Sequence, residues 1–170
     1  MSNNVEIGCE NSKKYTQEST KKYFFNITPQ TNIRATQNDR IFFRIPKDKL
    51  YPSGLRRRNQ LERYNDYKAD LREIAKKKGF TFPEQGLEIH FYIPTPKTWT
   101  KYKKKEMNGQ LHQQRPDLSN LLKAVEDALL VEDKKIAHYH SISKRWVNSS
   151  SGYIEFIVHL PVFSSKDNMM

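Results

Sequence analysis

Hydrophobic residues recur at helical spacing in two segments of the chain. From about 57 to 78 they stand three or four positions apart, as in a helix that buries one face: Leu61, Tyr64, Tyr67, Leu71, Ile74 and Ala75. Gly79 follows at the position of a C-terminal cap, directly after three lysines that suit the negative end of the helix dipole. This pattern predicts a long amphipathic helix that ends at about residue 78.

The second helical segment is RPDLSNLLKAVEDAL, residues 115–129. At about 100° per residue, its apolar side chains fall on one side: Leu118, Leu121, Leu122, Val125, Ala128 and Leu129. Its polar side chains fall on the other side: Ser119, Asn120, Lys123, Glu126 and Asp127. Pro116 and Asp117 mark the start of this helix, and we expect the Asp117 carboxylate to cap its first free N–H groups.

Alternation of apolar and polar residues predicts the strands. Leu87, Ile89, Phe91 and Ile93 alternate with polar neighbours, and this strand stops at the prolines of PTP. Other strands are predicted at about 22–28 and 40–45, and a terminal pair in KKIAHYHSISKRW and GYIEFIVHL. The order β-β-α-β-α-β-β predicts an α+β fold, a single domain with a mixed β-sheet and two helices packed on one face.

The ends of the chain are polar and lack periodicity. We expect residues 1–21 and 164–170 to be flexible tails around a folded domain of 22–163. No apolar run approaches the roughly 18 residues of a membrane helix, and no hydrophobic signal region stands at the start, so we expect a cytoplasmic protein. The single cysteine, Cys9, excludes an intrachain disulfide and a cysteine-based zinc site.

The charge balance is strongly basic, with 30 Lys+Arg against 19 Asp+Glu and a formal net charge of +11. Such a charge favours phosphate-rich partners, although a basic surface can also serve solubility alone. The segment 97–114 interleaves lysines with Trp99 and Tyr102, a pattern typical of nucleic-acid contacts and also of a solvated loop. His138 and His140 lie on one side of a predicted strand and could hold a metal ion or simply be exposed.

Against this basic background, acidic residues gather in one short segment: Asp117, Glu126, Asp127, Glu132 and Asp133. They could be the solvated side and cap of an ordinary helix. Their carboxylate oxygens also suit Mg²⁺, and an acidic pocket beside a phosphate-attracting surface is what metal-dependent phosphodiester cleavage requires. The polar side of the helix therefore becomes the candidate site. No Gly-rich phosphate loop and no nucleophile–base triad competes with it.

These residues carry a family resemblance. RPDLSNLLKAVEDAL followed by VEDKKI resembles the RusA-like Holliday junction resolvases, endodeoxyribonucleases of phages and prophages, over about residues 22–160. Their signature, [KR]-P-D-x-D-N-x-x-K-x-x-x-D-x-L with an acidic pair soon after, matches at Arg115, Pro116, Asp117, Asn120, Lys123, Asp127, Leu129, Glu132 and Asp133. The resemblance implies a homodimer that binds four-way DNA junctions and nicks two strands with Mg²⁺ or Mn²⁺.

The resemblance also implies roles for single residues. Asp117 and Asp133 would be metal ligands, and Lys123 would contact the scissile phosphate or its leaving oxygen. Asn120 and Asp127 would orient and hold the site. The family's second aspartate falls on Ser119, whose neutral hydroxyl is a weak ligand for a hard cation. Either a neighbouring acid, Glu132 or Glu126, compensates for the missing charge, or the protein binds branched DNA with a weakened or inactive site.

The predicted DNA contacts are basic, aromatic and polar side chains around this helix: Arg34, Arg56, Arg57, Lys97, Trp99, Lys101, Tyr102, Lys103, His112, Arg115 and Asn120. The predicted metal ligands are Asp117, Ser119, Glu132 and Asp133. Besides the nuclease, two hypotheses stay open: a non-catalytic protein that binds branched DNA, and an RNA-binding α+β domain that uses aromatic residues of its sheet.

Overall fold

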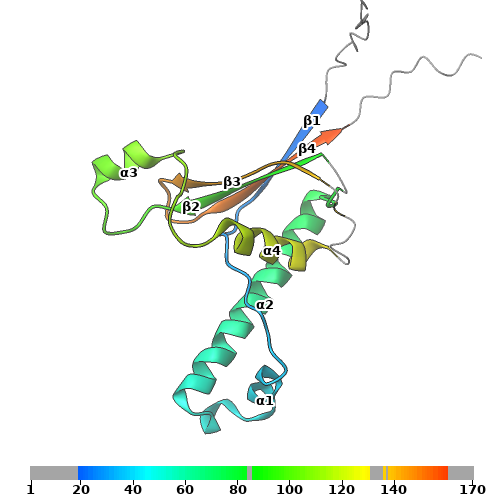
Figure 1. The fold of residues 1–170 in the computed structure, drawn as a ribbon, viewed down its shortest axis with the longest axis vertical. Coiled ribbons are helices and arrows are strands. Elements are labelled where there is room, and N and C mark those ends of the chain that lie inside the picture. Colours follow the sequence, from blue (N-terminus) through cyan, green and yellow to red (C-terminus); the bar gives the residue numbers. More distant parts are fainter. Residues whose placement is uncertain (1–18, 84–85, 131–135, 137, 161–170) are drawn as a thin grey trace, which may run out of the picture.

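The computed structural model describes residues 19–83, 86–130, 136 and 138–160. Four helices and four strands lie in these ranges, together with a short 3-10 turn, η1 (Figure 1). In chain order they are β1 (Ser19–Phe25), α1 (Asp39–Arg44), η1 (Lys47–Lys49), α2 (Pro52–Lys78), β2 (Leu87–Pro94), α3 (Lys101–Met107), α4 (Leu118–Leu129), β3 (Tyr139–Val147) and β4 (Tyr153–Leu160). The described elements form the single α+β domain that the sequence predicts.

The strands form one mixed sheet in the order β1-β4-β2-β3. β4 runs antiparallel to both β1 and β2, whereas β2 and β3 are parallel. The last two strands of the chain are therefore not neighbours, because β2 lies between them. β1 begins at Ser19, so residues 19–21 belong to the sheet and not to the predicted tail. The predicted tails otherwise fall almost entirely outside the described residues.

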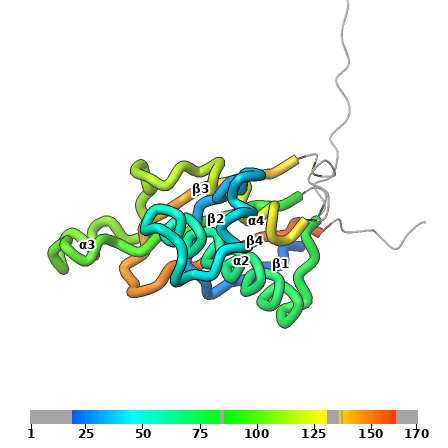
Figure 2. The backbone as a smooth tube through the Cα atoms, turned by 90° about the horizontal axis from the view of Figure 1, so that it is seen from below, coloured from blue at the N-terminus to red at the C-terminus, as the bar shows by residue number. Residues whose placement is uncertain are grey.

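Both long helices cover the same face of the sheet, as predicted (Figures 1 and 2). Alternate strand residues point to this face and are buried: Phe25, Leu87, Ile89, Phe91, Ile154, Phe156 and Val158. The apolar stripes of α2 and α4 complete the same core with Tyr64, Tyr67, Leu71, Ala75, Leu121, Ala124, Val125 and Ala128. Burying these stripes fixes which side of α4 faces outward.

The long helix α2 ends as the sequence predicts but begins earlier, at Pro52 instead of about 57. Proline suits the first helical turn because a backbone N–H at that position would have no partner within the helix. At the other end, Gly79 has a left-handed φ of 60° and donates its N–H to the carbonyls of Ala75 and Lys76. The additional first turn carries α2 well away from the sheet, where α1 lies beside it (Figure 1).

The prediction of a strand at about 40–45 is wrong, because this segment forms the short helix α1. Its first residue, Asp39, accepts hydrogen bonds from the backbone N–H and hydroxyl of Thr36. At its other end, Arg58 of α2 donates to the carbonyls of Phe42 and Ile45. The tertiary contacts with Arg58 satisfy C-terminal carbonyls of a helix that β-branched and aromatic residues would not favour on their own.

The basic segment 97–114 contains a helix, α3, that the sequence analysis did not predict. Thr100 caps it by accepting a hydrogen bond of 3.2 Å from the backbone N–H of Lys103. α3 lies beyond one end of the sheet and contacts the rest of the molecule little (Figures 1 and 2). We refer to residues 97–111 as the α3 arm.

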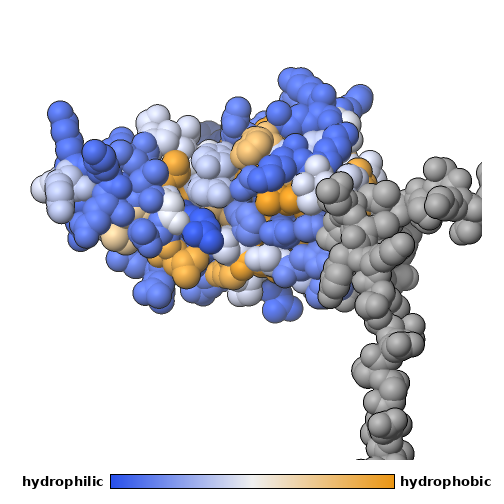
Figure 3. All heavy atoms as spheres, turned by 90° about the horizontal axis from the view of Figure 1, so that it is seen from above, coloured by the Kyte–Doolittle hydropathy of each residue, from blue (hydrophilic) through white to orange (hydrophobic). Residues whose placement is uncertain are grey.

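Among the described residues, no helix covers the other face of the sheet (Figure 1). Figure 3 shows this side with apolar patches among polar residues, and with an almost wholly hydrophilic α3 arm at one end. Tyr92 and Tyr153 stack on it with ring centroids 4.1 Å apart. Within the described ranges, no helix is both long and apolar enough to cross a membrane.

A substitution at Gly152 tests how tightly the chain is packed at the start of β4. A Cβ atom at this position would lie 2.9 Å from Cδ of Pro29 and closer still to the carbonyl oxygen of Tyr92. We expect Gly152→Ala to lower the free energy of unfolding by about 1–3 kcal/mol, because backbone atoms must move to admit the methyl group. Urea denaturation measures the change, and the exposed neighbour Ser150→Ala should stay within about 0.5 kcal/mol of wild type. Equal stability of the two variants would contradict the packing described here.

Candidate functional site

The outward side of α4 carries a row of polar residues. Asn120, Lys123 and Asp127 follow one another at spacings of three and four, so they form one stripe on the helix surface. The opposite side is fixed in the core by fully buried Leu121, Ala124 and Val125. The burial of one side of α4 thus determines where these polar groups point.

The Asp127 carboxylate joins this stripe to two other elements. Its Oδ2 accepts hydrogen bonds from Nδ2 of Asn32 and, at 3.3 Å, from the hydroxyl of Tyr64 on α2. Its Oδ1 pairs with Nζ of Lys123 at 3.4 Å. Asn32 also donates to the Tyr64 hydroxyl at 3.1 Å. We call these four residues the Asp127 cluster. It holds the Lys123 ammonium group on the outward side of α4.

Tyr64 acts as a hydrogen-bond donor in this cluster. Burial and the nearby Asp127 charge raise its pKa to about 12, so the hydroxyl keeps its proton at neutral pH. A second tyrosine, Tyr139 of β3, donates to Oε1 of Glu126 at 2.8 Å, and burial followed by this hydrogen bond raises its pKa further still. Both carboxylates of the second half of α4 are therefore engaged by phenols.

A salt bridge holds the loop that carries Asn32. The backbone N–H of Asn32 donates to the carbonyl of Asn120 at 2.9 Å, which attaches the loop to α4. Arg57 of α2 donates to both carboxylate oxygens of Asp39, at 2.9 and 2.8 Å, and to the carbonyl of Arg34. The Arg57 guanidinium holds the pKa of Asp39 far below its usual range. The loop is thus fixed at both of its ends.

Asp117 directly precedes α4, as predicted, but its side chain does not cap the helix. The carboxylate is exposed and accepts no hydrogen bond from the first turn. Lys144 of β3 instead holds this entry to the helix, donating through Nζ to the carbonyls of Gln114 and Pro116. The bond between Arg115 and Pro116 is cis. Asp117 and the exposed Ser119 and Asn120 therefore lie at a fixed helix start that faces solvent.

The carboxylates of Asp117 and Asp127 cannot share one metal ion. Ten residues of helix separate Asp117 from Asp127, a rise of about 15 Å. Glu126 lies seven residues after Ser119, a rise of about 10 Å, and it is hydrogen-bonded to Tyr139. In this structure Glu126 therefore does not supply the charge that the serine lacks. Asp127 pairs with Lys123, whereas Asp117 is exposed at the helix start.

The remaining predicted metal ligands, Glu132 and Asp133, lie outside the described residues. Among the described residues, no group of three or more His, Cys, Asp and Glu side chains is arranged to hold a metal ion. The rings of His138 and His140 lie 5.1 Å apart, and that of His159 lies 4.6 Å from His140. Despite these ring contacts, the three histidines are not arranged as a metal site in the described part of the chain.

The predicted DNA contacts fall into separate regions. Arg34 and Arg56 lie near the beginning of α2, Arg115 and Asn120 at the start of α4, and Lys97, Lys101 and Lys103 on the α3 arm. All seven are exposed. In Figure 1, the start of α4 lies between the α3 arm and the α1–α2 end of the molecule. Arg57 differs from these residues, because its guanidinium is engaged by Asp39.

The two aromatic residues of the α3 arm have different environments. Trp99 packs on Trp146 with ring centroids 4.9 Å apart, and Nζ of Lys103 lies 4.4 Å from the Trp99 ring centroid. Tyr102 is 79% exposed. Of this pair, Tyr102 is thus the aromatic side chain that a nucleic acid could reach without rearrangement, while Trp99 attaches the arm to β3.

His112 is only 3% exposed, so it is not available for the predicted direct DNA contact. Its ring packs against Trp146 with centroids 3.8 Å apart, and its Nδ1 accepts the backbone N–H of Gln114. Burial, and to a lesser degree Lys144, lower its pKa. A neutral imidazole in this position supports the loop that leads to Asp117.

The sequence analysis missed Asn32, Tyr64 and Lys144 as parts of the site. Tyr64 was assigned only to the buried stripe of its helix, and its hydroxyl offered no separate signal. Lys144 alternates with Ile142 and Trp146 on a strand face that is otherwise apolar, and a lysine there signals a specific partner. Asn32 sits in a polar loop, where no sequence pattern distinguishes it from its neighbours.

Comparison with known proteins gives one family. The family model described as Endodeoxyribonuclease RusA matches residues 25–146, which run from the last residue of β1 through α1, α2, β2, α3 and α4 and include most of β3. No curated protein matches the chain. The matched range contains the Asp127 cluster, Asp117 and the α3 arm.

The salt bridge between Asp39 and Arg57 predicts a pH dependence of stability. An unfolded aspartate has a pKa of about 3.9, and the pKa of folded Asp39 is lower. Its ionised form therefore stabilises the fold above about pH 4, and this contribution is lost as the pH falls through the lowered pKa. We expect the melting temperature of Asp39→Asn to be lower than that of wild type at pH 7. The difference between the two melting temperatures should shrink below about pH 4.

Thermal unfolding followed by circular dichroism from pH 7 to pH 2 measures this difference. Asp48→Asn is the matched control, because Asp48 is exposed in η1, and its melting curve should follow that of wild type. If the melting temperature of Asp39→Asn stays below that of wild type by the same amount from pH 7 to pH 2, the role given to the salt bridge is wrong.

Proposed function

Because the chain belongs to the endodeoxyribonuclease RusA family, we propose that it is a structure-selective endonuclease that cleaves four-way DNA junctions in recombination or repair. One observation carries the proposal: the polar side of α4 presents an exposed carboxylate, Asp117, and a lysine, Lys123, that a second carboxylate holds in place. These groups lie in a chain of net charge +11, which attracts phosphates.

The divalent ion of this proposal is Mg²⁺ or Mn²⁺. The exposed Asp117 carboxylate fits such an ion, since hard cations prefer oxygen ligands and no backbone N–H of the first turn competes for these oxygens. We propose that Glu132 and Asp133 complete the ligand set, with the Ser119 hydroxyl as a weak neighbour. When bound, the ion would lower the pKa of the attacking water and neutralise phosphate charge.

The chain's own groups would act on the phosphodiester as follows. Lys123 would place its ammonium group at the scissile phosphate and stabilise the charge on the leaving 3′-oxygen as the P–O bond breaks. The products are a 3′-hydroxyl and a 5′-phosphate. Asn120, one turn before Lys123, would donate an amide hydrogen bond to the substrate. Asp127 would act as a positioning residue, because its carboxylate contacts Lys123, Tyr64 and Asn32.

The exposed basic residues would hold the branched DNA on both sides of α4. Lys97, Lys101 and Lys103 of the α3 arm would follow phosphates on one side, with Tyr102 against unpaired bases at the branch. Arg34 and Arg56 would bind phosphates on the other side, and Arg115 would bind one at the start of α4. Symmetric cleavage of a four-way junction requires two such sites, so we propose that the active form is a homodimer.

Ser119 favours a second candidate, a protein that binds branched DNA without cutting it. The serine removes one formal negative charge from the family's ligand set, and weaker ion binding lowers or abolishes cleavage. Both candidates predict the same DNA affinity. Only cleavage and its dependence on Asp117 separate them.

Asp117→Asn distinguishes the two candidates. The change keeps the size of the side chain but removes the charge that would hold the divalent ion, so we expect junction cleavage to fall at least about 100-fold. Binding of the same junction should change little. A labelled four-way junction, incubated with Mg²⁺ or Mn²⁺ and compared with plain duplex, measures both quantities.

Asp48→Asn is the control, because it makes the same exchange on the exposed η1 turn. It should cleave like wild type. Junction binding without cleavage by the wild-type protein in either ion would support the non-catalytic candidate, and preferred binding of single-stranded RNA would overturn both.

Ser119→Asp restores the charge of the family signature. We expect it to raise the cleavage rate or to lower the Mg²⁺ concentration for half-maximal rate, because an added carboxylate strengthens binding of a hard cation. A titration of single-turnover cleavage against Mg²⁺ measures both. Ser150→Asp adds the same charge at an exposed turn before β4 and should leave the titration unchanged. A loss of cleavage in Ser119→Asp would mean that the site works through serine.

A further inference from the structure

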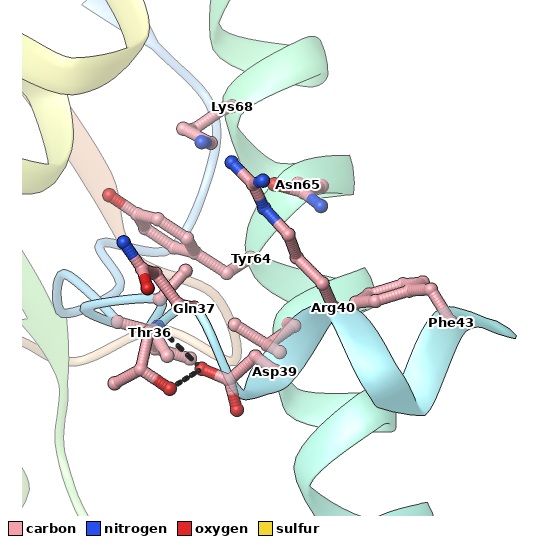
Figure 4. A pocket seen from close by; sticks show the side chains of 11 residues that line it. Thr36, Gln37, Asp39, Arg40, Phe43, Tyr64, Asn65 and Lys68 are labelled. Atoms are coloured by element: carbon pink, nitrogen blue, oxygen red, sulfur yellow. Dashed lines mark hydrogen bonds between the residues drawn. The ribbon is translucent and has the colours of Figure 1, made fainter.

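A pocket lies directly beside the Asp127 cluster. The loop before α1, α1 itself and one side of α2 enclose about 310 Å³, a volume at the lower end of small-molecule sites. Figure 4 shows side chains from these elements pointing into it. Those that carry useful chemistry are Gln37, Arg40, Phe43, Tyr64, Asn65 and Lys68. The pocket has no place in the cleavage chemistry proposed above.

The charge inside the pocket is positive. Its one acid, Asp39, is neutralised by two hydrogen bonds from Arg57 and accepts two more from Thr36. Arg40 and Lys68 remain, and Figure 4 places their charged ends on the same side of the pocket. Nζ of Lys68 lies 4.8 Å from the centroid of the Tyr64 ring, which keeps it at the pocket wall. An anionic group such as a phosphodiester suits this side.

The pocket also presents neutral hydrogen-bonding groups. Gln37 and Asn65 expose amide groups that make no hydrogen bond to another described residue. Each amide offers donors and an acceptor together, the combination that reads the edge of a nucleic-acid base. Phe43 is 45% exposed and adds an apolar surface of the kind that bases contact. A phosphate alone would not use these groups, whereas a complete nucleotide would.

Tyr64 connects the pocket to the candidate active site. Its side chain lines the pocket, and its hydroxyl donates to Asp127, the carboxylate that holds Lys123. Asn32, on the same loop as Gln37, contacts both residues. A group bound in the pocket is therefore connected to a group bound at Lys123 through two side chains, Tyr64 and Asp127.

We infer that this pocket receives one unpaired nucleotide of the DNA strand, adjacent to the bond that is cleaved. Its phosphate lies between Arg40 and Lys68, and its base edge faces Gln37 and Asn65. The inference rests on the proposed nuclease function and adds to it a source of base preference, because unstacked bases are available at a branch point and amide side chains discriminate among them.

The test uses a readout that does not require cleavage. The full-length Asp117→Asn protein is mixed with four-way junctions that carry 2-aminopurine at each position near the branch, because its fluorescence rises when the base leaves the stack. We expect a rise at one position. Adding Gln37→Ala or Asn65→Ala should reduce that rise at least about fivefold. This factor corresponds to the lower end of the effect of losing one specific base contact. Gln60→Ala, an exposed amide elsewhere on α2, is the matched control.

The phosphate contacts are tested by salt dependence. We expect Arg40→Ala and Lys68→Ala each to reduce the slope of log K against log salt by about 1, the effect of one lost phosphate contact. Lys76→Ala removes an exposed charge at the far end of α2 and should leave the slope unchanged. Circular dichroism of each variant verifies that it is folded.

The outcomes separate this inference from the function on which it rests. Wild-type cleavage of the unmodified junction is measured in parallel. Normal cleavage, with a fluorescence rise that is equal in all pocket variants or absent at every position, would overturn the nucleotide pocket and leave the nuclease intact. Failure of the wild-type protein to bind or cleave the junction would overturn both. A rise that depends on Gln37 or Asn65 would support the pocket even if cleavage proved weak.

Discussion

One carboxylate organises the candidate site. Asp127 accepts hydrogen bonds from Asn32 and Tyr64 and pairs with Lys123, so it joins the loop before α1, the long helix α2 and the outward side of α4. Each of these elements is fixed elsewhere: α2 and α4 by the core, and the loop by Arg57 and Asp39. The Lys123 side chain is positioned by Asp127, the side chain at which these three separately anchored elements meet.

This arrangement divides the molecule into a rigid centre and two exposed extensions. The sheet, α2 and α4 share one core, whereas the α3 arm and the α1–α2 end project from it on either side of the start of α4 (Figure 1). Exposed cations are placed on both extensions. A branched DNA has phosphates in several directions from its centre, and cations on both sides of a site suit it better than one continuous basic stripe. The pocket at Tyr64 lies where the rigid centre meets the α1–α2 end.

Periodicity predicted the elements that supply the core, and tertiary contacts decided the rest. The buried stripes of α2 and α4, the cap at Gly79 and the alternation in β2 follow from the sequence because burial leaves a regular pattern. The strand expected at 40–45 is a helix whose C-terminal carbonyls are satisfied by Arg58 of α2. At the site, the helical spacing of Asn120, Lys123 and Asp127 could be recognised in the sequence. Asn32, Tyr64 and Lys144 are distant in sequence and join the site only when the chain folds. Glu132 and Asp133 stay a sequence prediction.

The proposed mechanism requires that Lys123 acts on the scissile phosphate and does not merely attract DNA. The direct measurement is the single-turnover cleavage rate of a four-way junction by Lys123→Ala, taken together with its dissociation constant for the same junction. We predict a rate at least about 100-fold below wild type with an affinity that changes no more than that of Lys76→Ala. A Lys123→Ala protein that loses affinity but cleaves the bound junction at the wild-type rate would contradict the account.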